Sequence, residues 1–196
     1  MKSNRLQINK MCLAAMFIAL GWSLPFITGQ IQQVGNMLCP MHLPVLIAGF
    51  VLGPWYGCVI GMVIPLSRSL IFGMPPLYPI GFAMMFELAM YGFVSGFLFK
   101  LLKTKTKWSD LSIIYISLIT AMILGRGIWG ITRTICGLFP NSSFTWKAFM
   151  SGAFLTAWPG ILLQLILIPL LIFTLNKARL LNRYMDFKND EITKID

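Results

Sequence analysis

Four charged side chains interrupt the long apolar stretches of this sequence: Arg68, Glu87, Arg126 and Arg133. A charge at bilayer depth is costly unless it is paired or faces water, so each of these residues predicts a polar cavity or an ion pair. In the simpler interpretation, Glu87 and one arginine form an ion pair that stabilises a helix bundle, or an arginine extends to the membrane interface. We favour a functional cavity for Arg126. Arg68 lies near the end of its stretch and fits either interpretation.

The charges within these stretches are unbalanced, because three arginines face one glutamate. A guanidinium in a low-dielectric environment needs an anionic partner, and a carboxylate or phosphate on a ligand would supply it. Arg126 and Arg133 are seven residues apart and would project from nearly the same helix face, with Trp129 between them. Glu87 and Tyr91 are four apart and would share a face in the same way. These spacings predict one pocket for an anionic ligand, with Arg126 as its main electrostatic partner.

Further polar side chains are candidates for the same pocket. Asn36 precedes the second apolar stretch, His42 stands at its start, and Gln164 lies in the last stretch. The sequence leaves two interpretations of His42 open: a ligand contact, or an interfacial residue whose polar atoms are satisfied elsewhere. The predicted substrate-binding residues are Asn36, His42, Arg68, Glu87, Tyr91, Arg126, Trp129, Arg133 and Gln164.

The composition places the chain in a membrane. Its 196 residues are 57% hydrophobic and 11% charged, whereas soluble proteins average roughly 45–50% and 25%. The net charge of +10 would suggest a nucleic-acid partner in a soluble protein, but the basic residues flank apolar stretches, so we expect lipid and no nucleic acid. The four cysteines show no CxxC pairing and predict neither a metal site nor disulfides. We interpret them as small buried apolar residues.

The apolar stretches that surround these residues predict six membrane-spanning helices. They cover about residues 11–28, 40–72, 78–101, 111–137 and 148–175, and a turn at 53–57 divides the second stretch into two shorter spans. The predicted fold class is all-α: a polytopic membrane protein with a bundle of six transmembrane helices. We expect a single transmembrane domain over residues 1–196, with its core at about 8–177 and a cytoplasmic tail at about 178–196.

The basic residues support this count. They gather before the first span, in the loop at 100–107 and after the last span, and positive charge is enriched on cytoplasmic flanks. With six crossings all three regions fall on one face of the membrane. We therefore expect a multi-pass protein of the cell membrane with both termini in the cytoplasm.

Several sequence runs resemble a known family. The basic amino terminus leads into Ala15 and Ala19, an AxxxA pattern that lets another helix approach closely. The run Cys39-Pro40-Met41-His42-Leu43-Pro44-Val45-Leu46 precedes Gly53-Pro54-Trp55-Tyr56-Gly57, and residues 82–96 carry Glu87 and Tyr91. Up to about residue 177, the chain resembles the S components of energy-coupling factor (ECF) transporters.

The resemblance implies a substrate-binding subunit of an ECF-type ABC importer, which captures a water-soluble vitamin or related metabolite for ATP-driven uptake. It implies a transmembrane T subunit, which Ala15 and Ala19 would face, and two ATPase subunits as partners. It also implies no cofactor in this chain, because the partner subunits use the ATP, and the sequence has no GxxxxGK[ST] motif. Pantothenate is the favoured ligand, because it is small and carries one carboxylate with hydroxyl and amide groups. Folates, other vitamins and a queuosine-type base remain alternatives.

Two other function classes compete with this one. A membrane-embedded enzyme would need a nucleophile with a base, or a metal cluster, and the chain has one histidine and no HExxH or GxSxG motif. We therefore expect no enzyme. A self-contained secondary transporter for a small anionic metabolite would be expected to show an internal repeat, and none is visible.

Overall fold

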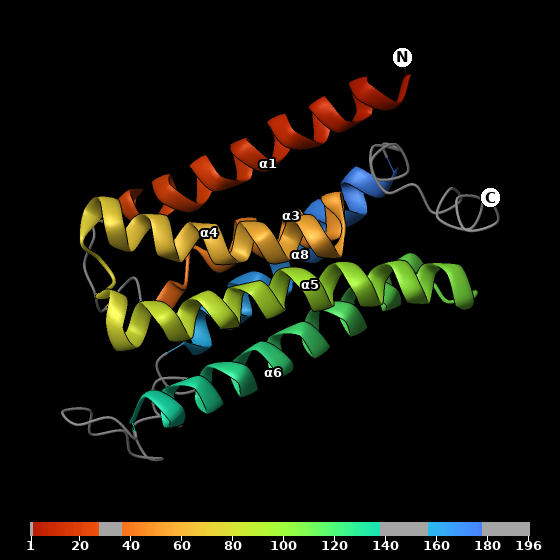
Figure 1. Cartoon of the computed structure of the whole chain (residues 1–196). Coiled ribbons are helices and arrows are strands. Elements are labelled where there is room, and N and C mark those ends of the chain that lie inside the picture. The colour runs from red at the N-terminus through yellow and green to blue at the C-terminus, as the bar shows by residue number, and fades with distance from the viewer. Residues whose placement is uncertain (1, 28–36, 138–156, 178–196) are drawn as a thin grey trace, which may run out of the picture.

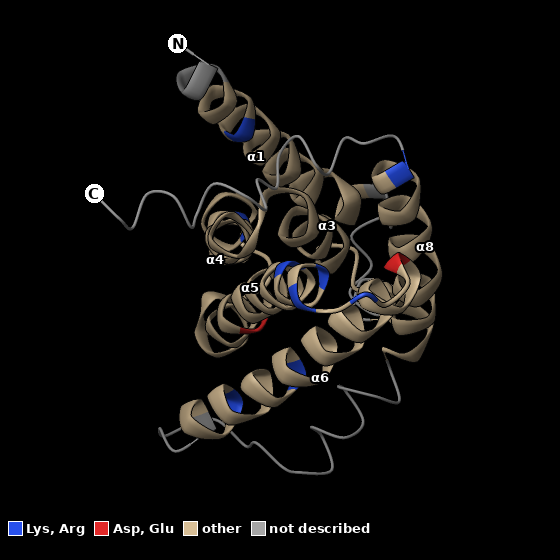
Figure 2. Ribbon diagram, turned by 90° about the vertical axis from the view of Figure 1, so that its right-hand side faces the viewer, with Lys and Arg blue, Asp and Glu red and all other residues tan. Residues whose placement is uncertain are grey.

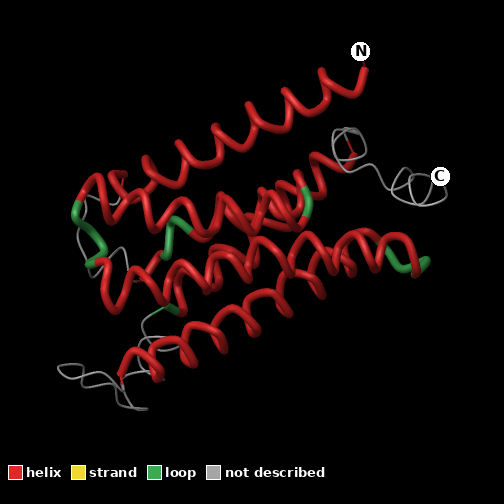
Figure 3. The backbone as a smooth tube through the Cα atoms, viewed as in Figure 1, coloured by secondary structure: helices red, strands yellow, loops and turns green. Residues whose placement is uncertain are grey.

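The computed structural model describes residues 2–27, 37–137 and 157–177. These residues form helices and contain no strand, which confirms the predicted all-α fold class (Figure 3). The elements in chain order are α1 (Lys2–Ile27), α3 (His42–Leu52), α4 (Pro54–Phe72), the short helical turn η1 (Leu77–Gly81), α5 (Phe82–Lys105), α6 (Asp110–Gly137) and α8 (Trp158–Lys177).

Most of these helices are long and apolar enough to cross a membrane. Five stretches of the described residues meet this criterion: Leu6–Phe26, Pro54–Phe72, Leu77–Lys105, Asp110–Cys136 and Trp158–Lys177. The sixth predicted span is α3, which is apolar but has only 11 residues. At 1.5 Å per residue it is about 16 Å long, roughly half the thickness of the hydrocarbon core. The predicted start of the last span, at 148, lies outside the described residues.

The break between α3 and α4 is narrower than predicted. Only Gly53 separates the two helices, and its φ of 95° is a conformation that L side chains rarely adopt. Pro54 begins α4, where its missing N–H leaves no helical hydrogen bond unmade. Trp55, Tyr56 and Gly57, which were predicted to belong to the turn, are part of the first turn of α4.

The helices form a bundle with α1 at one edge and α6 at the other (Figure 1). The start of α1, the α5–α6 connection and the end of α8 lie at the same end of this bundle, here called the basic end (Figure 1). At this end, Lys103 donates a hydrogen bond of 2.8 Å to Asn176, which in turn donates one of 2.6 Å to Asp110. Figure 2 views the molecule from the basic end, with lysine and arginine residues in blue. The arrangement agrees with the predicted number of crossings.

The opposite end of the bundle, here called the outer end, contains the start of α3 and the turn between α4 and η1 (Figure 1). Away from this end, α4 and α5 are in close contact. Gly57 and Gly92 touch backbone to backbone, and a Cβ atom on Gly92 would overlap the carbonyl oxygen of Gly57. The buried rings of Phe50 and Phe99 pack edge to face 5.3 Å apart and join α3 to α5. This packing fixes α5 against α3, which positions the site described next.

Candidate substrate-binding site

A cluster of polar side chains is buried among α3, α5 and α6, toward the outer end. Glu87 and Tyr91 lie four residues apart on α5, and each is at most 2% exposed. The Tyr91 hydroxyl donates a hydrogen bond of 2.9 Å to Oε1 of Glu87. The predicted shared face of these two residues is therefore present in the structure. This face of α5 points into the protein, because α5 is packed between α4 and α6.

Arg126 of α6 completes an ion pair in this cluster. Its Nη1 atom lies 3.4 Å from Oε1 of Glu87, and the two side chains are 11% and 2% exposed. At this depth the attraction is screened weakly, and removing either partner would leave a buried charge. The pair makes the cluster electrically neutral when His42 is neutral. The sequence-based excess of positive charge is therefore smaller than the residue count suggested.

Arg126 also contacts Cys39, which precedes α3. Nη2 of Arg126 lies 3.7 Å from Sγ of Cys39, within hydrogen-bonding distance for sulfur. Burial raises the pKa of the Cys39 thiol, so this group is protonated at neutral pH and does not neutralise the arginine. The backbone of Cys39 has a φ of 46°, a left-handed conformation that is uncommon for residues other than glycine.

His42 stands at the start of α3 on the other side of Glu87. Its ring is 3% exposed, lies 5.1 Å from the Tyr91 ring between centroids, and is tilted by 56°. Nε2 is 3.5 Å from Oε1 of Glu87, which is close enough for electrostatic attraction. Neither ring nitrogen makes a hydrogen bond, and such unpaired buried groups are rare in folded proteins.

A glycine on α6 allows this geometry. A Cβ atom on Gly125 would overlap the edge of the Tyr91 ring, so the ring lies directly against the backbone of α6. His42 packs on the same ring. Because Tyr91 is held between two helices, its hydroxyl is fixed on Glu87, and Glu87 in turn is fixed beside Arg126.

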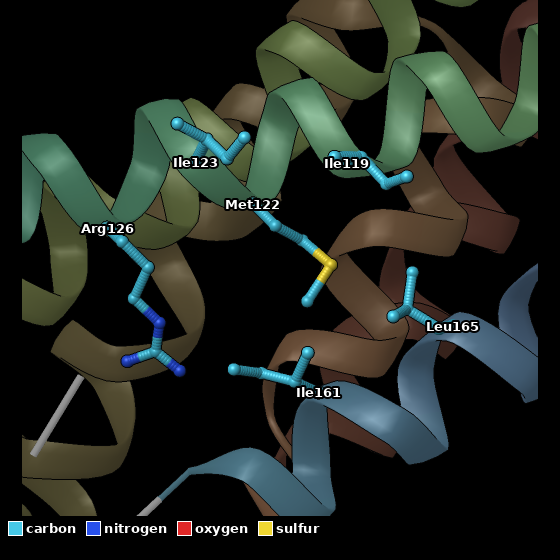
Figure 4. Close-up of a pocket in the computed structure, with 6 residues that line it drawn as sticks. All are labelled: Ile119, Met122, Ile123, Arg126, Ile161 and Leu165. Atoms are coloured by element: carbon cyan, nitrogen blue, oxygen red, sulfur yellow. The ribbon is translucent and has the colours of Figure 1, made fainter. Parts of the chain in front are cut away.

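A cavity of about 190 Å³ adjoins the cluster between α6 and α8 (Figure 4). Arg126 is the charged residue in its wall, and its side chain extends from α6 toward α8 (Figure 4). The rest of the wall is apolar and consists of Ile119, Met122, Ile123, Ile161 and Leu165. For comparison, an engineered cavity of about 150 Å³ holds a benzene molecule. The cavity therefore has room for a small apolar group beside the aliphatic part of the Arg126 side chain.

Arg68 lies elsewhere in the structure. It donates a hydrogen bond of 3.0 Å from Nη1 to the backbone oxygen of Trp22, and its guanidinium lies over the rings of Phe26 and Phe72 at 5.4 and 5.7 Å. The Trp22 ring donates a hydrogen bond of 2.9 Å to Ser67. These contacts join α1 to the last turns of α4, so Arg68 is stabilised without a ligand.

The remaining predicted site residues are placed as follows. Trp129 and Arg133 follow Arg126 on α6 after about one and two turns, and both are half-buried. Gln164 is 2% exposed on α8, which also forms one wall of the cavity. Asn36 lies outside the described residues. The structure thus brings together His42, Glu87, Tyr91 and Arg126.

Sequence reasoning missed Cys39 and Gly125. The cysteine was interpreted as a buried apolar residue, and its contact with Arg126 spans 87 positions in the sequence. The CPMH run at 39–42 already contained a signal, because it places a thiol and the only histidine three residues apart, beside the predicted polar segment. The structure also changes the interpretation of Cys12, which is exposed.

The family model described as the substrate-specific component of ECF transporters matches residues 9–172. The comparison with curated proteins and the comparison with solved structures each give no match. The match covers most of the sequence, including every described residue of the buried cluster. The chain belongs to the substrate-specific components of ECF transporters and is a membrane-embedded substrate-binding subunit of an ECF importer.

Proposed function

We propose that the buried cluster and the cavity beside it hold a small water-soluble metabolite for uptake. The observation that carries this proposal is the buried pairing of Glu87 with Arg126 beside an apolar cavity between two membrane-spanning helices. Charged side chains at this depth are expensive, and they are retained mainly where they serve a cavity or a ligand. The guanidinium supplies directional donors, and the apolar wall supplies contact area.

The proposed ligand is a vitamin or related metabolite, with pantothenate as the first candidate. Its carboxylate is a suitable partner for Arg126, because a guanidinium forms charge-assisted hydrogen bonds with carboxylates. Its branched aliphatic part suits a wall of isoleucine, leucine and methionine side chains.

We further propose that Ala15 and Ala19 of α1 face a transmembrane T subunit, which works with two ATPase subunits that use the ATP. Both alanines are exposed in this chain, whereas Phe17, on the opposite face of α1, is buried. Small residues four apart allow a second helix to approach closely. On this proposal, the chain itself binds no cofactor.

The basic end of the bundle is proposed to face the cytoplasm, with both termini on that side. Lysine and arginine are enriched at this end, as expected for cytoplasmic flanks. Single cysteines at the termini and in the 100–107 loop, labelled from outside intact cells, check the orientation. Labelling at any of these sites would contradict the proposed orientation.

The experiment for the binding function is purification of the chain alone in detergent, followed by mass spectrometry of whatever it retains. We expect one small metabolite in about equimolar amount, released unchanged on denaturation. Conversion of that metabolite by the purified chain would indicate an enzyme instead. Uptake into vesicles that contain this chain alone, without ATP, would indicate a secondary transporter.

A further inference from the structure

Three buried polar atoms of the cluster, on two side chains, have no hydrogen-bond partner. Two are the ring nitrogens of His42, which is 3% exposed, and the third is Nε of Arg126. Leaving a buried polar group unpaired is costly, so these atoms are expected to find partners in the working protein. Both residues lie beside the same carboxylate oxygen of Glu87. A single ligand that reached this carboxylate would therefore lie near both side chains.

The carboxylate of Glu87 determines which ring nitrogen of His42 carries the proton. Nε2 faces Oε1 of Glu87 at 3.5 Å, and a carboxylate favours an N–H group on the nitrogen that faces it. In the neutral ring, Nδ1 is then a hydrogen-bond acceptor. Its remaining requirement is a donor, such as a hydroxyl or an amide N–H.

Arg126 has the complementary requirement. Its Nη1 atom faces Glu87 and its Nη2 atom faces Cys39, so Nε–H is the donor of the guanidinium that still needs an acceptor. The same side chain forms part of the cavity wall between α6 and α8 (Figure 4). Because Nε is itself buried, a molecule whose apolar part lies in that cavity would have to displace the aliphatic part of this side chain to present an acceptor to Nε.

We propose that the ligand is a small carboxylic acid or amide that also carries a hydroxyl or N–H donor, and that His42 selects for this donor through Nδ1. The inference rests on the proposed function and specifies its substrate class. The carboxyl or carbonyl oxygen accepts from Nε of Arg126, the donor group binds His42, and an aliphatic or aromatic body lies against the apolar wall.

Two pairs of probes test the class with the wild-type chain in detergent. The first pair is pantothenate and its counterpart without both hydroxyls, N-(3,3-dimethylbutanoyl)-β-alanine. The second pair is 2-hydroxyisovalerate and isovalerate. The deoxy counterpart of pantothenate keeps an amide N–H donor, whereas isovalerate has none. Calorimetry should therefore show that 2-hydroxyisovalerate binds about tenfold more tightly than isovalerate, because isovalerate leaves a buried acceptor unpaired. Equal affinities within the second pair, or no binding of either hydroxy acid, would overturn the inference.

Two substitutions of His42 test whether this residue selects the ligand or only holds Glu87 in place. In His42→Asn, the amide oxygen takes the place of Nδ1, whereas in His42→Gln, the amide nitrogen takes the place of Nε2. We expect His42→Asn to keep most of the preference for the hydroxylated probe and His42→Gln to lose it. The reverse order would mean that His42 only supports Glu87. If either variant fails to fold, the wild-type probe pairs still decide.

Mass spectrometry distinguishes the failure of this inference from the failure of the proposed function. A retained metabolite that lacks a hydroxyl or N–H donor would uphold substrate binding and refute the role of His42. A purified chain that retains no metabolite and binds none of the probes would refute the proposed function as well.

Discussion

Glu87 and Arg126 face each other across the α5–α6 interface at 3.4 Å, and both are buried in the membrane-spanning part of the bundle. Each charge therefore has a partner before any ligand arrives. A ligand carboxylate at this site would approach a guanidinium that already has a counter-ion. The pair holds the arginine in place and moderates its attraction for anions.

The pair predicts strong coupling between its two residues. Glu87→Gln and Arg126→Gln should each lower the stability by about 3–5 kcal/mol, because each leaves one buried charge unpaired. The double variant Glu87→Gln/Arg126→Gln should lose clearly less stability than the sum of the two single losses, since no charge remains buried. Thermal unfolding in detergent measures all three. Additive losses would show that the two side chains do not interact.

Gly125 offers a second prediction with a matched control on the same helix. Gly125→Ala should displace the Tyr91 ring and lower the stability by about 1–3 kcal/mol, as overpacking of a core does. Gly127 is exposed and a Cβ atom added there would meet nothing within 4 Å, so Gly127→Ala should be neutral or slightly stabilising. Melting temperature and ligand affinity should fall together in Gly125→Ala alone. Equal effects of both changes would refute the contact with Tyr91.

Arg68 tests whether an intramembrane arginine serves the fold. Arg68→Leu removes the hydrogen bond to Trp22 and the contacts with two phenylalanine rings, so the stability should fall by about 2 kcal/mol. The affinity for the metabolite that copurifies with wild type should stay unchanged. A loss of affinity without a loss of stability would return Arg68 to the binding site, where the charge count had placed it.

The sequence predicted the helices well because its apolar stretches are long and the breaks between them contain glycine and proline. It also predicted that Glu87 and Tyr91 share a face, since four-residue spacing on a helix fixes their relative direction. The sequence could not predict which charged residues on different helices form pairs. The pairing of Glu87 with Arg126 joins residues 39 positions apart and depends on how two helices pack. The confinement of Arg68 to the α1–α4 contact likewise depends on tertiary packing.

The exposed face of α1 with Ala15 and Ala19 is predicted to be needed for transport but not for ligand binding. Ala15 and Ala19 are exposed, so replacing both with tryptophan should leave the fold and the ligand affinity of the isolated chain nearly intact. Transport by the complete transporter should be abolished, because the large side chains prevent a partner helix from approaching. Leu20→Trp is a control on the same helix, since Leu20 is also exposed but lies on a different face from Ala15 and Ala19. Loss of ligand binding in the alanine variant would mean that these residues serve the fold of this chain.

The last prediction concerns the charge of the ligand. If the ligand is anionic and Arg126 binds it, Arg126→Ala should weaken binding by about one to two powers of ten, which is the effect of losing a charge-assisted hydrogen bond. Arg126→Lys should also weaken it, because an ammonium group cannot reproduce the donors of the guanidinium fork. Calorimetry with the copurified metabolite and with its neutral amide provides the measurement.

Glu87 sharpens this experiment. Because the glutamate offsets part of the positive charge of Arg126, Glu87→Gln should increase the preference for the acid over the amide, provided that the protein still folds. The double variant Glu87→Gln/Arg126→Gln should lose that preference and keep a neutral, foldable site. Equal binding of acid and amide by wild type, or normal binding of the acid by Arg126→Ala, would show that the ligand is not held by this charge. Arg126 would then serve only to pair Glu87 inside the bundle.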